Sequence, residues 1–119
     1  MGPVPSGFTL EKVVGRELNQ ICIGRYDLQF CFDSSHVISC QGKVIIELDG
    51  KSVVVFERDE PWWSDVTVLP SIAGRDATAW KIESSHEFSI SLTGDAKLRF
   101  QSTDCPYEEF VIHPEIWVV

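Results

Sequence analysis

The feature that most constrains the fold of this chain is a short motif that occurs twice. Residues 13–17 read Val-Val-Gly-Arg-Glu, and residues 72–76, 59 positions later, read Ile-Ala-Gly-Arg-Asp. After a one-residue shift, the alternating apolar pattern of residues 28–32 matches that of residues 88–92. A repeated supersecondary unit indicates two halves that bury their apolar faces against each other and share one core.

The apolar residues in each half recur at every second position, the period of a strand with one buried face. No long amphipathic helix separates consecutive strands, as a βαβ unit would require. A helical turn that ends at Gly15 or Gly74 is expected ahead of each half. The sequence therefore predicts a single domain, residues 1–119, built from two pseudo-repeated meander halves at about residues 8–57 and 67–119. The expected fold is all-β and mainly antiparallel, a β-sandwich or a partly open barrel with one or two short helices.

Turn residues predict where the hairpins fold back. Residues 49–50 read Asp-Gly, the strongest short hairpin signal in the chain. Keeping the apolar residues of neighbouring strands on one face requires three-residue loops, which we expect at residues 34–36 and 94–96. The preceding hairpin is expected to turn at residues 25–26, and its counterpart at residues 84–86 is one residue longer. This difference accounts for the one-residue shift between the halves.

The charge of the chain narrows its possible partners. Ten basic residues against eighteen acidic ones give a net charge of −8. Such a surface repels phosphate, so we expect neither nucleic acid nor an anionic membrane as a partner. The charge favours a basic protein partner. No apolar run is long enough to span a bilayer, and residues 1–7 lack the pattern of a secretion signal, so a cytoplasmic location is expected.

The four cysteines, Cys22, Cys31, Cys40 and Cys105, are expected to be free thiols. They form no Cys-x-x-Cys pair, and the histidines have no metal-binding spacing, so the sequence predicts neither a metal site nor a cofactor. Cys22 and Cys31 are expected to be diagonal neighbours on adjacent strands. A disulfide between them is the lesser alternative.

Catalytic signatures are missing from the sequence. There is no glycine-rich phosphate loop and no Gly-x-Ser-x-Gly elbow, so a non-enzymatic protein is expected. Glu108 and Glu109 are adjacent on a predicted strand, so only one of them can face inward, where it needs a partner. Arg16 and Arg75 are the candidate partners of Glu109. These three residues are expected either to line a pocket between the halves or to form a salt bridge that ties the last strand to the Gly-Arg corner.

One segment combines acidic residues with two adjacent tryptophans. Trp62 and Trp63 point to opposite faces in a strand and lie about 100° apart in a helix, so at least one is expected to be half exposed. Exposed aromatic residues with a polar rim are typical of interaction hot spots. We therefore expect a partner-binding surface, with the tryptophans packed over the sheet as the alternative. Its residues are Asp59, Glu60, Trp62, Trp63 and Asp65.

The Gly-Arg-acid motif, the alternating strands and the segment Tyr-Glu-Glu-Phe-Val-Ile at residues 107–112 resemble a family of short bacterial all-β proteins of unassigned function. Residues 69–113 carry most of this resemblance. Some small acidic proteins of this type are similar to the immunity partners of secreted bacterial toxins. The resemblance implies a non-enzymatic protein-binding module that inhibits a basic bacterial effector. The alternatives are a small-molecule or enzymatic site between the halves and a structural homodimer.

Overall fold

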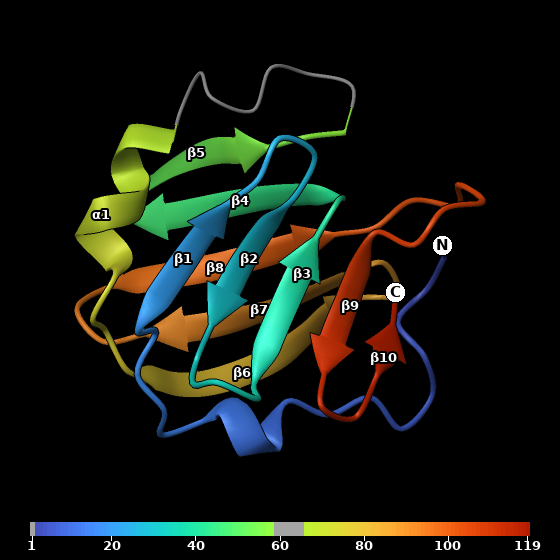
Figure 1. Cartoon of the computed structure of the whole chain (residues 1–119), viewed down its shortest axis with the longest axis horizontal. Helices are drawn as coiled ribbons and strands as arrows, with labels where there is room; N and C mark the ends of the chain where they lie inside the picture. The colour runs from blue at the N-terminus through green and yellow to red at the C-terminus, as the bar shows by residue number, and fades with distance from the viewer. Residues whose placement is uncertain (1, 59–65) are drawn as a thin grey trace.

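A computed structural model describes residues 2–58 and 66–119 of the chain, which form two five-stranded antiparallel sheets packed face to face (Figure 1). The first sheet contains, in spatial order, β1 (Gln20–Ile23), β2 (Leu28–Cys31), β3 (Val37–Cys40), β9 (Phe110–His113) and β10 (Trp117–Val118). The second contains β5 (Lys51–Phe56), β4 (Lys43–Leu48), β8 (Ala96–Gln101), β7 (Glu87–Leu92) and β6 (Ala77–Ser84). The fold is therefore all-β and mainly antiparallel, as predicted. Of the two predicted alternatives it is the β-sandwich, and the sheets do not close into a barrel.

Each sheet combines a three-stranded meander from one predicted half with a hairpin from the other. Strands β1, β2 and β3 are extended by β9 and β10, and strands β6, β7 and β8 are extended by β4 and β5. The two sheets thus have the same order of corresponding strands, with the hairpins exchanged between the halves. Figure 1 shows the strands of one sheet running across those of the other. The internal repeat in the sequence stays a prediction, because strand order alone does not test it.

A short helical turn precedes each meander, as predicted. These turns are a 3-10 turn, η1 (Glu11–Val13), and a one-turn helix, α1 (Leu69–Ile72). Gly15 and Gly74 follow them with φ angles of 91° and 88°, a region that favours glycine. The N–H of Gly15 donates to the carbonyl of Ala77, and the N–H of Gly74 donates to the carbonyl of Leu18, both at 2.8 Å. The two Gly-Arg corners are therefore joined to each other by reciprocal hydrogen bonds.

Four fully buried phenylalanines join the two sheets at the centre of the core. Phe88 and Phe100 stack with their ring centroids 4.8 Å apart. Phe110, from the other sheet, meets both rings edge-on at 5.6 Å, and Phe30 meets Phe100 edge-on at 5.8 Å. The apolar carboxyl end also docks here, because Val119 is only 1% exposed and belongs to the same core cluster. Neither sheet can bury these rings without the other.

The Asp-Gly turn and the two three-residue loops are predicted with the right length, but both three-residue loops are displaced by one residue. Residues 49–50 form the predicted two-residue turn. The three-residue loops lie at residues 33–35 and 93–95, one position earlier than predicted. At the first loop the Asp33 carboxylate accepts the backbone N–H groups of Ser35 and His36 at 2.8 and 2.6 Å. These side-chain hydrogen bonds begin the loop at Asp33. The alternation of apolar residues does not predict them.

The first hairpins of the two meanders differ by one residue, as predicted, but the difference arises from a bulge and not from a longer loop. The first turns at residues 25–26. In its counterpart Ile82 pairs with Phe88 as predicted. The predicted three-residue loop at residues 84–86 is wrong, because Ser84 pairs with Glu87 and the extra residue is a bulge at Glu83. The carboxylate of Glu83 contacts two side chains of neighbouring strands, which fixes the bulge.

Candidate functional site

The predicted partner-binding surface lies outside the described residues. Its residues are Asp59, Glu60, Trp62, Trp63 and Asp65. The prediction made for them stays a prediction. The two residues that flank this segment, Arg58 and Val66, are described, and Arg58 shows where the segment begins.

Arg58 follows β5 and contacts the loop that joins β8 to β9. Its guanidinium carbon lies 5.2 Å from the centroid of the Tyr107 ring, and its Nη2 donates to the carbonyl of Glu108 at 3.1 Å. A cation above an exposed aromatic ring is attracted to it by about 0.5–1 kcal/mol. Tyr107 is 62% exposed, and Glu108 beside it is exposed as well. We call Arg58, Tyr107 and Glu108 the Arg58–Tyr107 corner.

A cleft of about 480 Å³ lies beside this corner. It is lined by Gly42, Lys43, Glu57, Arg58, Gln101, Ser102, Thr103, Cys105 and Glu109. The cleft therefore brings together cations, carboxylates, a thiol and hydroxyls. Cys105 has a lowered pKa, first because of a hydrogen bond with the side chain of Thr103.

Glu109 is the inward-facing carboxylate of the cleft, and only 4% of it is exposed. The backbone N–H of Thr103 donates to its Oε1 at 2.8 Å, and the Thr103 hydroxyl lies 3.2 Å from both carboxylate oxygens. Burial raises the pKa of Glu109, and the hydrogen bonds that it accepts, first from the Thr103 backbone, bring that pKa below its ordinary value. The buried carboxylate is therefore ionised at neutral pH and is held by Thr103.

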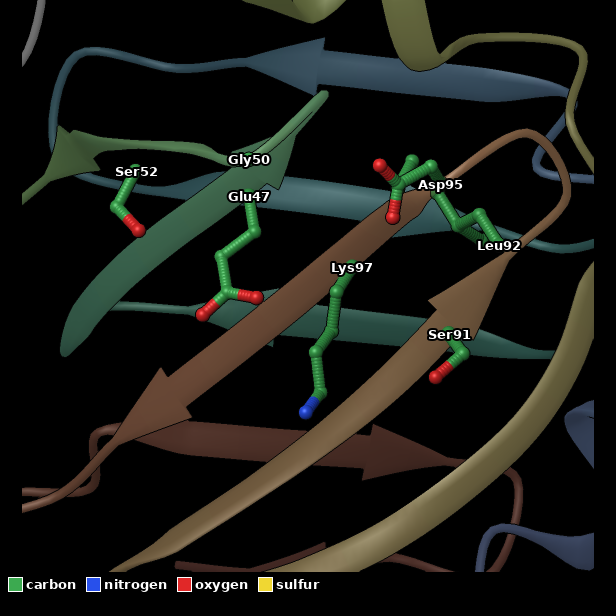
Figure 2. Close-up of a pocket in the computed structure, with 8 residues that line it drawn as sticks. Glu47, Gly50, Ser52, Ser91, Leu92, Asp95 and Lys97 are labelled. Carbon is green, nitrogen blue, oxygen red and sulfur yellow. The ribbon is translucent and has the colours of Figure 1, made fainter.

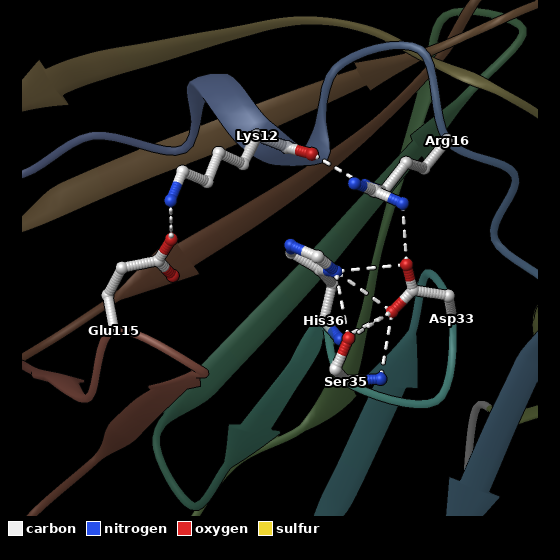
Figure 3. A network of polar contacts seen from close by, with 6 residues as sticks. All are labelled: Lys12, Arg16, Asp33, Ser35, His36 and Glu115. Atoms are coloured by element: carbon white, nitrogen blue, oxygen red, sulfur yellow. Dashed lines mark hydrogen bonds and ion pairs between the residues drawn. The ribbon is translucent and has the colours of Figure 1, made fainter.

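The structure places the other two residues of the predicted pocket elsewhere. Arg16 donates from Nη1 to Asp33 at 2.6 Å (Figure 3). Arg75 donates from Nη1 to the carbonyls of residues 93–94, both at 2.8 Å. Each arginine also donates from Nε to the carbonyl four residues earlier, at 2.7 and 3.0 Å respectively. Arg16 and Arg75 therefore each hold a three-residue loop against a helical turn, and they do not meet Glu109.

Asp33 and Ser35 of the first loop and His36 next to it lie together, but in the wrong arrangement for a nucleophilic triad (Figure 3). His36 Nδ1 lies 2.9 Å from both carboxylate oxygens of Asp33. The Ser35 hydroxyl lies 3.4 Å from that same nitrogen. In a triad the serine and the carboxylate occupy opposite nitrogens of the imidazole. The hydrogen bond with His36 is the main reason that the pKa of Asp33 is lowered, so the cluster is a charged loop closure.

Sequence reasoning missed a row of ion pairs on the outer face of the second sheet. Arg99 Nε donates to Glu87 at 2.8 Å, and its Nη1 donates to Glu47 at 3.3 Å. Lys97 lies 2.7 Å from Glu83. Alternation along β7 and β8 already places these polar residues on the face opposite the phenylalanines. This pattern is the sequence signal that could have predicted a charged outer face. Register was needed to show which of them meet.

A hollow of about 410 Å³ lies at one end of this face (Figure 2). It is lined by Glu47, Gly50, Ser52, Ser91, Leu92, Asp95, Ala96 and Lys97. Figure 2 shows that the side chains of Glu47, Lys97 and Ser91 come from three neighbouring strands. The carboxylates, ammonium group and hydroxyls that line the hollow suit a polar ligand surface better than an apolar ligand.

The remaining predictions concern cysteines, metals and membranes. None of the four cysteines is in a disulfide bond, as predicted. Within residues 2–58 and 66–119, no three His, Cys, Asp or Glu side chains come together in a way that could hold a metal ion. In the same part of the chain, no helix has the length and apolar character needed to cross a bilayer.

The fold and the site together define a small acidic β-sandwich with an exposed tyrosine, Tyr107, in contact with Arg58. No protein family, no curated protein and no solved structure matches the chain. Its function therefore has to be proposed from its own residues.

Proposed function

We propose that the protein is a non-enzymatic protein-binding module, an inhibitor of the immunity type for a basic bacterial effector. It binds through the Arg58–Tyr107 corner and the acidic tryptophan segment that continues from Arg58. The observation that supports this proposal is Tyr107, which is 62% exposed and yet held by Arg58 at 5.2 Å. An aromatic side chain that is ordered before binding loses little entropy when a partner covers it. Such residues dominate the energetics of interfaces.

The charge around the corner supports a basic partner. The side chains of Asp104 and Glu57 are 81% and 45% exposed, and Glu108 is exposed as well. The sequence adds Asp59, Glu60, Asp65 and a net charge of −8. Opposite fields raise association rates, and added salt screens this effect. We infer a cytoplasmic site of action, since the four free thiols suit a reducing compartment.

The test begins with capture of a stoichiometric partner from the native host, identified by mass spectrometry. Its affinity is then measured by calorimetry for the wild type, Tyr107→Ala and the double variant Trp62→Ala/Trp63→Ala. Tyr26→Ala is the matched control, because Tyr26 is 70% exposed and its ring lies 5.1 Å from Arg25. We expect Tyr107→Ala and the double variant to weaken binding at least about 30-fold, as loss of a hot spot does. The control should bind like the wild type.

Two results would contradict the proposal. One is the absence of any stoichiometric partner. The other is equal affinity of Tyr107→Ala, the double variant and Tyr26→Ala for the captured protein. Light scattering of the free protein separates a third case, since a stable dimer at micromolar concentration would indicate the homodimer instead.

A further inference from the structure

Two cysteines lie next to each other on the outer face of the first sheet. In the register of β1 and β2, Cys22 is opposite Gln29 and Cys31 is opposite Gln20. Each cysteine is therefore one diagonal step from the other, and both lie on the face opposite the buried Phe30. The Cys22 side chain is near enough to Cys31 to raise the pKa of the Cys31 thiol. The sequence predicted that Cys22 and Cys31 are diagonal neighbours on adjacent strands, and the register confirms this placement.

We propose that Cys22 and Cys31 are a redox-active pair that forms a disulfide by exchange with a low-molecular-weight disulfide such as oxidised glutathione. The Cys22 thiolate attacks one sulfur of oxidised glutathione and releases one glutathione. Cys31 then attacks the Cys22 sulfur of this mixed disulfide and releases the second glutathione. Two protein thiols are oxidised to one disulfide, one glutathione disulfide is reduced to two thiols, and the two protons pass to the released glutathiones.

The two cysteines differ in a way that assigns their order of reaction. Cys22 is half-buried, whereas only 8% of Cys31 is exposed. Burial, and then the neighbouring Cys22, raise the pKa of Cys31 to about 11, so few Cys31 thiolates are present for reaction with a molecule from solution. Cys31 reacts only after Cys22 has brought a disulfide to it. Cys22 is thus the attacking thiol and Cys31 is the resolving thiol.

The other two cysteines do not share this arrangement. Cys40 is fully buried, and its thiol donates to the carbonyl of Ile38 at 3.7 Å. Cys105 lies in the loop between β8 and β9 and hydrogen-bonds within that loop. A disulfide between Cys22 and Cys31 would also affect the structure, because β1 is an edge strand of its sheet. A disulfide there would tie the edge strand to its neighbour.

The test is oxidation of the full chain in glutathione redox buffers, followed by acid quenching and mass spectrometry. We expect the intact mass to fall by two hydrogens, and a tryptic peptide of residues 17–25 to become linked to the peptide of residues 26–43. Because the second peptide also contains Cys40, the link is assigned in the variant Cys40→Ser. Cys31→Ser should instead accumulate a glutathione adduct on Cys22, whereas Cys22→Ser should leave Cys31 unmodified.

A second measurement follows the folded state of the wild type and does not depend on any variant. Oxidation should raise Tm by about 5 °C, because the bond constrains a short loop of the unfolded chain. Three outcomes overturn the proposal. They are the absence of the linked peptide in the most oxidising buffer, a link that uses Cys40 or Cys105 in place of Cys31, and a Tm that is unchanged or lower after the link has formed.

Discussion

At the scale of single residues, Arg75 holds two backbone turns that are far apart in the sequence. Its Nε donates to the carbonyl of Ser71, and its Nη1 donates to those of Thr93 and Gly94. Hydrogen bonds from a charged group to the backbone are each worth about 1.5–3 kcal/mol when one partner is removed. We expect Arg75→Ala to lower the free energy of unfolding by at least about 2 kcal/mol, measured by urea denaturation.

The control for Arg75 is Lys12→Ala, because the Lys12 side chain is 73% exposed and forms only a surface ion pair with Glu115 at 3.4 Å. It should change the free energy of unfolding by less than about 0.5 kcal/mol. Arg75→Lys should recover little, since one ammonium group cannot donate to both turns in the same geometry. Equal stability of Arg75→Ala and Lys12→Ala would show that the loop closes without the arginine.

Gly42, which lines the cleft, lies where the neighbouring residues leave no room for a side chain. A methyl group at this position would lie 2.8 Å from the Phe110 ring and 2.9 Å from Cβ of Glu109. Both neighbours are buried, so neither can move without loss of packing. We expect Gly42→Ala to lower the free energy of unfolding by about 1–3 kcal/mol, whereas Gln41→Ala, at the exposed preceding residue, should have little effect. A Gly42→Ala variant as stable as the wild type would mean that the loop at Glu109 moves to accommodate the methyl group at no cost in stability.

At the scale of elements, the sequence predicts single strands well and their partners only when those are adjacent. Alternation predicted the hairpins because a turn fixes the register of its two strands. The pairs β3–β9 and β4–β8 were not predicted, because they join strands far apart in the chain. Alternation shows which face of a strand is buried but does not show which distant strand is its partner. The same limit applies to the site. Burial of one of two adjacent glutamates followed from alternation, but the contact of Glu109 with Thr103 depends on an irregular loop.

The ion pairs on the outer face of the second sheet should make stability depend on acid pH. The pKa of Glu83 is lowered from 4.5 to about 2, first by the hydrogen bond from Lys97 and then by that from Ser89. A carboxylate whose folded pKa is depressed adds stability above its unfolded pKa and loses it as pH falls through the folded one. We therefore expect the contribution of Glu83 to be complete above about pH 4.5 and to be lost between pH 4.5 and 2.

The measurement for this prediction is the free energy of unfolding against pH for the wild type and Glu83→Gln. The two curves should differ by about 1–3 kcal/mol at neutral pH and converge near pH 2, the lower figure allowing for solvent screening of a partly exposed pair. Glu11→Gln, at an exposed position of η1, is the control and should follow the wild-type curve. A constant difference between Glu83→Gln and the wild type across this pH range would contradict the assignment.

At the scale of the whole molecule, the two Gly-Arg-acid motifs meet where the halves join. Glu17 and Asp76, the acidic residues of the two copies, are directly opposite each other in an isolated antiparallel bridge. The backbone bonds on either side, from Leu18 to Arg75 and from Ala77 to Arg16, make this a non-hydrogen-bonded pair, the kind in which side chains lie closest. Two acidic residues are therefore directly opposite each other at the junction of a chain that already carries a charge of −8.

Like charges directly opposite each other in a sheet are destabilising, and opposite charges contribute about 0.2–1 kcal/mol. Replacing one carboxylate by a cation should therefore stabilise the junction. We expect Glu17→Lys to raise the free energy of unfolding by about 1 kcal/mol in low salt, and the gain to shrink as ionic strength screens the exposed pair. Glu11→Lys makes the same change in net charge without a carboxylate across a bridge, so it measures the general effect of lowering the charge. If Glu17→Lys is no more stabilising than Glu11→Lys, the repulsion at the junction is already relieved by solvent, and the meeting of the two motifs is held by its backbone bonds alone.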